Sequence, residues 1–80
     1  MNGANHTMKI NGNKVKIMYA ELGLTQQQFA DLAGMDRTVL SRLLNRGTCR
    51  GDMIVRIAKA LNIDPLEITQ GEPFNEEKET

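Results

Sequence analysis

Three arginines stand within one short stretch, GMDRTVLSRLLNRG, which runs from Gly34 to Gly47. Almost no acid balances them there, and arginine side chains can bind nucleic-acid phosphates and base edges through several N–H donors. The arginines are Arg37, Arg42 and Arg46. Apolar residues recur in the same stretch at helical spacing, namely Val39, Leu40, Leu43 and Leu44. The pattern predicts a short helix with an apolar back and a cationic front.

The charge of the chain is divided unevenly, although its net charge is zero. Residues 1–50 hold seven Lys and Arg against three Asp and Glu, and residues 51–80 hold three against seven. A basic half beside an acidic half is typical of a polyanion-binding surface with an acidic tail. Ordinary surface charge could produce the same distribution.

Residue types that support catalysis or metal binding are scarce. The chain has one histidine, His6, and one cysteine, Cys49, which are too far apart for a familiar zinc-ligand spacing. It contains no P-loop and no dinucleotide-binding glycine motif, and its acids form no recognisable pair. We therefore expect no catalytic residues, no metal site and no cofactor.

The sequence also indicates a compartment. A single cysteine cannot form an internal disulfide, and the polar N-terminus lacks the apolar stretch of a signal peptide. No apolar run approaches the roughly 18 residues that span a bilayer. These features predict a cytoplasmic protein, in which Cys49 is a packed and unreactive thiol.

Glycines and capping residues limit the first two predicted helices. The first covers residues 13–22 and ends at Gly23, in the position of a C-terminal glycine. Thr25 and Gln28 have the spacing of a capping box, which begins the second helix. Gly34 ends that helix.

Three further helices follow by the same criteria. Asp36 caps the third helix, which ends at Gly47. The fourth covers approximately residues 52–61. Asp64 and Pro65 then supply an N-cap and a first-turn proline, which predict a fifth, very short helix.

The elements together predict an all-α, five-helix bundle over residues 13–70. Only the segment MKI, residues 8–10, is a candidate strand, and it is too short to show an alternating pattern. Residues 1–12 are expected to form a flexible N-terminal segment and residues 71–80 an acidic flexible tail.

The second and third helices, joined at Gly34, have the outline of a helix-turn-helix. Ala30 is small where the two helices would cross closely, and Leu40 would face back into the core. The polar residues of the third helix then face outward, namely Arg37, Thr38, Ser41, Arg42 and Asn45. A helix with such an outer face fits the major groove of DNA.

Two strings, LGLTQQQFADLAGMDRTVLSRLLN and IVRIAKALNIDPLEI, resemble the Xre/Cro/phage-repressor family of helix-turn-helix regulators. The resemblance extends over residues 13–69 and implies a lambda-repressor-like DNA-binding domain. It implies a prokaryotic or phage transcriptional regulator, a repressor, whose partner is double-stranded DNA. The helix 36–46 would then read bases in the major groove.

The resemblance also implies roles for individual residues. The family binds a DNA phosphate with the glutamine that begins its second helix, and Gln26 occupies that position with Gln27 beside it. Base readout is implied for Arg37, Thr38, Ser41 and Arg42. Arginine can bind guanine O6 and N7, and a threonine methyl can pack on a thymine methyl. Phosphate contacts are further implied for Asn45, Arg46, Thr48 and Arg50.

The chain departs from the family pattern after the third helix. The family often has glycine directly after the Asn45 position, where this chain has Arg46, and Gly47 follows one residue later. We therefore expect the helix to end one residue later and Arg46 to be aimed differently. The string TCRGD replaces a preferred proline and apolar residue, which leaves open where the fourth helix begins and whether Thr48 and Arg50 contact phosphate.

Apolar residues after the fourth helix exceed what one small core needs. Those expected to join two copies of the chain are Ile63, Leu66, Ile68 and Phe74. Members of the family form two-fold dimers, which place two base-reading helices about 34 Å apart on a pseudo-palindromic operator. We therefore expect a homodimer.

Other interpretations use the same residues. The glutamines at 26–28 could be helix-forming surface residues, and the outward arginines could pair with Asp31, Asp36 or water. The alternative function is an antitoxin or another protein-interaction module of the same fold, which the acidic tail favours. Salt-dependent binding to random duplex DNA distinguishes the two functions.

Overall fold

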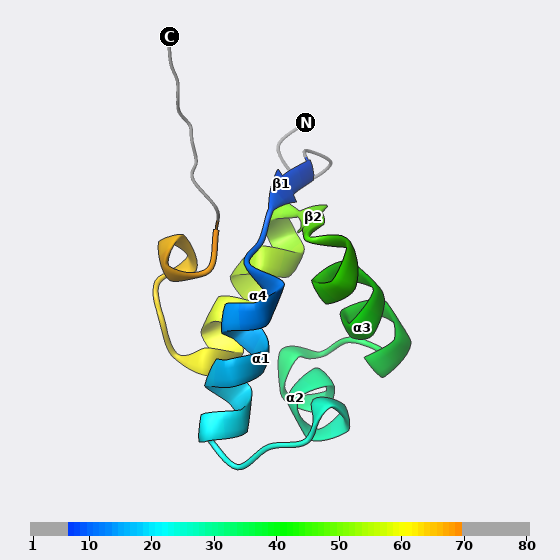
Figure 1. The fold of residues 1–80 in the computed structure, drawn as a ribbon, viewed down its shortest axis with the longest axis vertical. Helices are drawn as coiled ribbons and strands as arrows, with labels where there is room; N and C mark the ends of the chain where they lie inside the picture. The colour runs from blue at the N-terminus through cyan, green and yellow to red at the C-terminus, as the bar shows by residue number, and fades with distance from the viewer. Residues whose placement is uncertain (1–6, 70–80) are drawn as a thin grey trace, which may run out of the picture.

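The computed structural model describes residues 7–69 of the chain, and the predicted acidic tail with Phe74 lies outside that range. Four α-helices and a two-stranded sheet make up most of the described part (Figure 1). In chain order the elements are β1 (Thr7–Lys9), α1 (Gly12–Glu21), α2 (Gln26–Ala33), α3 (Arg37–Arg46), β2 (Thr48–Arg50), α4 (Gly51–Leu61) and the 3-10 turn η2 (Pro65–Glu67). The mostly helical fold and its helix-turn-helix agree with the prediction.

The predicted helix limits rest on local capping chemistry. Thr25 and Gln28 form both hydrogen bonds of the capping box at the start of α2. The Asp36 carboxylate accepts from the backbone N–H of Thr38 at 2.8 Å and so begins α3. Gly47 ends α3 with a φ of 81°, a left-handed conformation that glycine adopts without steric cost. The start of α4, left open by the sequence, is Gly51.

The fifth α-helix is absent from residues 7–69, where a single 3-10 turn stands in its place. Asp64 and Pro65 begin this turn as predicted. The chain cannot continue as a helix, because the Ile68 carbonyl accepts from the backbone N–H of Asn11 at 2.7 Å and Thr69 pairs with Ile10 in an isolated bridge. Hydrogen bonds to a distant segment therefore replace the next helical turn.

The sheet corrects the all-α prediction and the predicted N-terminal boundary. β1 pairs antiparallel with β2, with Lys9 opposite Thr48 and Thr7 opposite Arg50. The segment from Thr7 onward thus belongs to the folded domain, whereas residues 1–12 were expected to be flexible. Strands of three residues are too short for an alternating sequence pattern, and their pairing depends on a partner some forty residues away.

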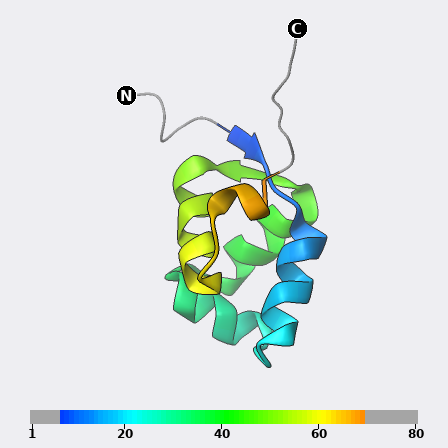
Figure 2. The same ribbon diagram turned by 90° about the vertical axis from the view of Figure 1, so that its left-hand side faces the viewer.

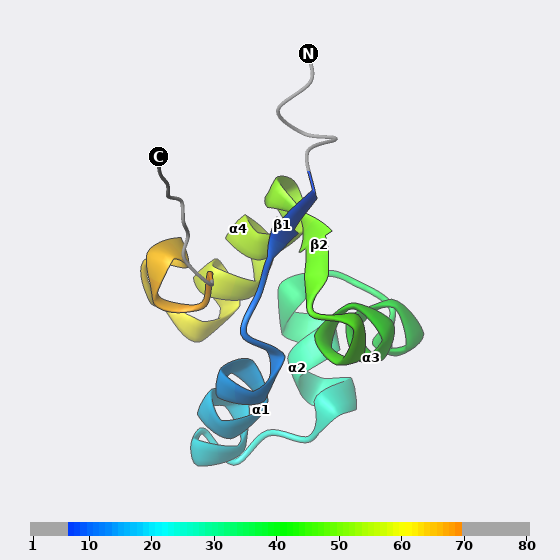
Figure 3. The same cartoon turned by 45° about the horizontal axis from the view of Figure 1, so that its top comes forward.

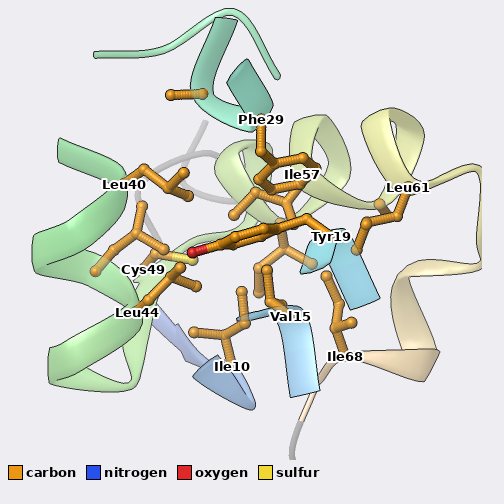
Figure 4. Close-up of a cluster of buried hydrophobic side chains, with 14 residues drawn as sticks. Ile10, Val15, Tyr19, Phe29, Leu40, Leu44, Cys49, Ile57, Leu61 and Ile68 are labelled. Carbon is orange, nitrogen blue, oxygen red and sulfur yellow. The ribbon is translucent and has the colours of Figure 1, made fainter. Parts of the chain in front are cut away.

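The hydrophobic core lies between the four α-helices and also takes side chains from the segments outside them (Figure 4). Tyr19 of α1 and Phe29 of α2 stack with their ring centroids 5.0 Å apart. Ile10, after β1, is 1 % exposed and Ile68, after η2, is 0 % exposed. The fully buried helical side chains include Val15, Phe29, Leu40 and Ile57. Both ends of the described chain are therefore anchored in one core.

One residue that was predicted to be buried is exposed. Val39 was assigned to the buried stripe of α3, but only Leu40, Leu43 and Leu44 of that stripe are buried. Other large apolar side chains in or next to α1 and α2 are also exposed, namely Ile17, Leu22 and Leu32. Short helices around a small core cover only a narrow stripe of each helix, so residues at the edge of the stripe stay in solvent.

The burial of Ile68 corrects its assignment to a dimer interface. The chain turns back after α4 and inserts this side chain into the core of its own protomer, where no second copy can reach it. Ile63 is partly buried and packs against the same core. Leu66 alone among the described members of that set is exposed, at 78 %.

Candidate nucleic-acid interface

The helix-turn-helix lies at one side of the molecule, with α3 outermost and η2 on the opposite side (Figure 1). α2 and α3 are joined through Gly34, whose φ is 71°. The Arg56 side chain of α4 donates to the Gly34 carbonyl oxygen at 3.1 Å. This bond ties the turn between the two helices to the helix behind it, so the angle between α2 and α3 is supported from outside the motif.

The outward surface of α3 carries the side chains predicted to read bases. Arg37, Thr38 and Arg42 are exposed, and Ser41 is partly exposed. Neither arginine forms an ion pair within residues 7–69. The two acids considered as partners are engaged elsewhere: Asp31 accepts from Gln27, and Asp36 caps its own helix. The guanidinium groups on this surface are therefore available to an external acceptor.

The N-terminus of α2 has the donors that an anion needs. The capping box uses the backbone N–H groups of Thr25 and Gln28, and those of Gln26 and Gln27 donate to no acceptor among the described residues. The Gln26 amide donates to the Tyr19 hydroxyl at 3.3 Å. Because the Tyr19 ring is stacked in the core, this bond fixes the direction of the Gln26 side chain at the helix end. A helix N-terminus with unbonded N–H groups favours phosphate.

The C-terminal end of α3 holds Asn45 in place through a residue of α1. The Asn45 amide oxygen accepts from Lys16 Nζ at 3.0 Å, which leaves the amide N–H donors for another acceptor. An ammonium and an amide thus lie together at this end of the helix. Both are exposed or partly exposed.

Three more predicted contact residues lie at the end of α3 and just after it, with Arg46 as the last residue of the helix and Thr48 and Arg50 in β2. α3 includes Arg46 and ends at Gly47, which confirms the one-residue extension. The Arg46 guanidinium turns to the sheet and donates to the carbonyl and hydroxyl oxygens of Thr48 at 3.1–3.3 Å. Arg50 forms an exposed ion pair with Asp52 at 3.1 Å. Arg46 and Arg50 are thus partly engaged, with free donors remaining on each guanidinium.

Three residues that position this site were missed by the sequence analysis: Lys16, Tyr19 and Arg56. Tyr19 had one detectable signal, because it lies four residues after Val15 on the buried stripe of α1. No signal in the sequence could have indicated the roles of Lys16 and Arg56, since each contacts a residue more than twenty positions away.

Cys49 lies in β2 at the edge of this region, and its thiol is buried. Burial raises the pKa of the Cys49 thiol from 9.0 to about 11, while the Arg46 guanidinium lowers it and the Asp52 carboxylate raises it. The folded protein therefore keeps the thiol proton after the unfolded chain has lost it. Stability from this group is complete below about pH 9 and is lost as the pH rises toward 11.

We expect Cys49 to react with iodoacetamide at least about a hundredfold more slowly in the folded protein than in urea near pH 8, because the thiolate is the nucleophile and burial also blocks access. Mass spectrometry of timed samples measures the reaction, with Cys49→Ala as the control for labelling elsewhere. Equal rates in both states would show that the thiol is accessible and ionised in the fold.

Among residues 7–69, no group of three or more His, Cys, Asp or Glu side chains is placed to hold a metal ion. Within the same part of the chain, no helix has the length and apolar character required to cross a membrane.

Comparison with known proteins agrees with this geometry. A family model described as helix-turn-helix (HTH_3) matches residues 15–68, which extend from α1 to the residue after η2. No curated protein and no solved structure shows a significant match to the chain.

Proposed function

This chain belongs to the Xre/Cro-type helix-turn-helix family, which binds DNA and is not enzymatic, and from that premise we propose that it is a sequence-specific regulator of transcription. The observation that supports this most directly is the outward surface of α3, where Arg37 and Arg42 are exposed and form no ion pair with the described residues. A helix with such a surface can enter the major groove of duplex DNA.

Base readout falls to the polar residues of α3, which we infer to be Arg37, Thr38, Ser41 and Arg42. An arginine that donates two hydrogen bonds to guanine O6 and N7 distinguishes that base from the other three. The buried leucines on the opposite side hold the helix rigidly, so these side chains can be presented in one register.

Phosphate contacts on either side of the groove would fix how α3 docks. We infer them for Gln26, Gln27, Asn45, Arg46, Thr48 and Arg50. Gln26 and Gln27 combine side-chain amides with unbonded backbone N–H groups at the start of α2. Arg46 is the last residue of α3, Thr48 and Arg50 follow in β2, and the two arginines carry two positive charges. Phosphate contacts orient a protein on DNA without distinguishing sequences directly.

Repression in a prokaryotic or phage cytoplasm is the simplest regulatory action for such a domain. A protein bound over a promoter excludes polymerase by occupancy alone and needs no further contact with it.

Two copies on a pseudo-palindromic operator would increase specificity, because one α3 helix contacts only a few base pairs. We propose that Leu66 lies at the seam between the copies. It is the most exposed large apolar residue in the described chain. η2 faces the viewer in Figure 2 and is separated from α3 by the bundle, so a seam there leaves α3 free for DNA.

We expect Arg42→Ala to weaken binding at the preferred site by about 1–3 kcal/mol and to relax preference at one base position. Sequences selected from a random duplex pool identify the preferred site, and titrations of parent and variant measure the loss. Lys59→Ala is the matched control, because it removes the same charge from the exposed last turn of α4.

The same titrations test whether DNA is the partner at all. Raising salt from about 50 to 200 mM should reduce the affinity of the parent by orders of magnitude, since several phosphates are neutralised. A flat salt response would contradict the proposal and favour a protein-interaction module. Unchanged base preference in both Arg37→Ala and Arg42→Ala would contradict the role of α3.

A further inference from the structure

The two strands of the sheet present one face outward. Opposite residues of an antiparallel pair lie on the same face, so Lys9 lies beside Thr48 and Thr7 beside Arg50. Met8 and Cys49 share the other face, and Cys49 is buried. The outward face, here called the sheet face, therefore consists of Thr7, Lys9, Thr48 and Arg50.

The sheet face is positively charged. Lys9 and Arg50 belong to it, and the Arg46 guanidinium lies against it through hydrogen bonds to Thr48. The acid paired with these three cations is Asp52, which contacts Arg50. Lys9 is exposed and makes no ion pair or side-chain hydrogen bond with any residue in the described range. Strand pairing thus fixes the backbone of Lys9 beside Thr48, and its ammonium group has no partner within the described range.

The sheet face continues the end of α3. Arg46 is the last residue of that helix and touches the first residue of β2. Figure 3 shows β1 alongside β2 beyond the end of α3. A duplex that receives α3 in its major groove carries a dense row of phosphates along the rim of that groove.

We propose that Lys9 binds a phosphate of the DNA backbone next to the bases read by α3, so that β1 is part of the DNA-binding surface. This inference rests on the proposed function. The occupant of the sheet face is the phosphodiester backbone of the same duplex, because charge complementarity and continuity with α3 both favour it. β1 contributes twice: it supplies the ammonium group, and its pairing holds the backbone of Thr48–Arg50 in place.

The test is the salt dependence of binding to random duplex DNA. For Lys9→Ala we expect the slope of log affinity against log salt to fall in magnitude by about 0.9, which corresponds to one phosphate contact. Affinity near 0.1 M salt should fall roughly five- to tenfold, equally on preferred and random sequences. Lys9→Arg should restore the slope. Lys59→Ala, the control of equal charge, should leave it near the parental value.

Phosphate ethylation interference gives a second, positional measurement. The parent should show several sensitive phosphates, and Lys9→Gln, which keeps most of the side-chain stem, should lose sensitivity at only one of them, next to the bases that α3 reads. If the parent binds DNA with a steep slope but Lys9→Ala, Lys9→Gln and Lys59→Ala all behave like it, the role of Lys9 is overturned while the proposed function stands. If the parent binds no duplex, the proposed function fails and this inference fails with it.

Discussion

We expect Ile68→Glu to unfold the domain, whereas Leu66→Glu, two positions earlier, should leave it folded. Ile68 is 0 % exposed and lies in the core together with Ile10 and Val15. A carboxylate there would lose its hydration without gaining a partner, at a cost of several kcal/mol or more. A domain of 80 residues has a free energy of unfolding of roughly 4–12 kcal/mol, so this single change can exceed most of it.

Leu66 has the opposite environment, which makes it the control. Its side chain is 78 % exposed, and the turn depends on its backbone N–H, which donates to Asp64 in any variant. Circular dichroism and thermal melting should show parental helix content and stability for Leu66→Glu and a disordered chain for Ile68→Glu. A folded Ile68→Glu would contradict the assignment of Ile68 to the core.

Leu66→Glu also tests the pairing of two copies. Sedimentation with a palindromic duplex should give two copies per duplex for the parent and one for Leu66→Glu, because two carboxylates would face each other across the seam. Two copies for both proteins would place the seam elsewhere. Ile68→Glu is uninformative about pairing, since it reports folding.

We expect Gly12→Ala to destabilise the domain by about 3 kcal/mol, because the added methyl has no space. α1 and α3 approach so closely there that a Cβ on residue 12 would collide with the carbonyl oxygen of Leu44 and lie 2.9 Å from its carbonyl carbon. The obstacle is helix backbone, which cannot rotate away like a side chain. Denaturant unfolding of parent and variant measures the difference.

Gly23→Ala is the matched control for this substitution. Gly23 has a left-handed φ of 78°, and a Cβ there would have no neighbour within 4 Å. The cost should be the conformational penalty alone, about 1 kcal/mol. If Gly12→Ala lowers the free energy of unfolding no more than Gly23→Ala does, α1 and α3 can move apart to accommodate the methyl group. Lys16 of α1 and Asn45 of α3 are hydrogen-bonded across the same two helices, and Asn45 is an inferred phosphate contact. Because Gly12→Ala would move α1 and α3 apart, it should weaken DNA binding as well.

The sequence by itself determined the limits of α2 and α3 and the outward surface of α3. Helix capping and termination depend on interactions within about four residues, so the sequence alone can predict them. They occur here at Thr25 and Asp36, which cap α2 and α3, and at Gly34 and Gly47, which end them. Helical spacing also predicted the buried side of α3 correctly, except for Val39 at its edge. Family membership followed from the same local strings.

Only the tertiary structure decided which distant residues meet. The pairing of β1 with β2, the Asn11–Ile68 hydrogen bond beside the buried Ile68 side chain and the Lys16–Asn45 bond join residues 29 or more positions apart. No periodic pattern in the sequence indicates them. The same holds for Lys9, whose position beside Thr48 depends on strand register. The physical reason is that such contacts depend on the path of the backbone, which the core as a whole selects. The chemistry of a side chain limits which partners it can bind, and the fold determines which of those partners are close enough to contact it.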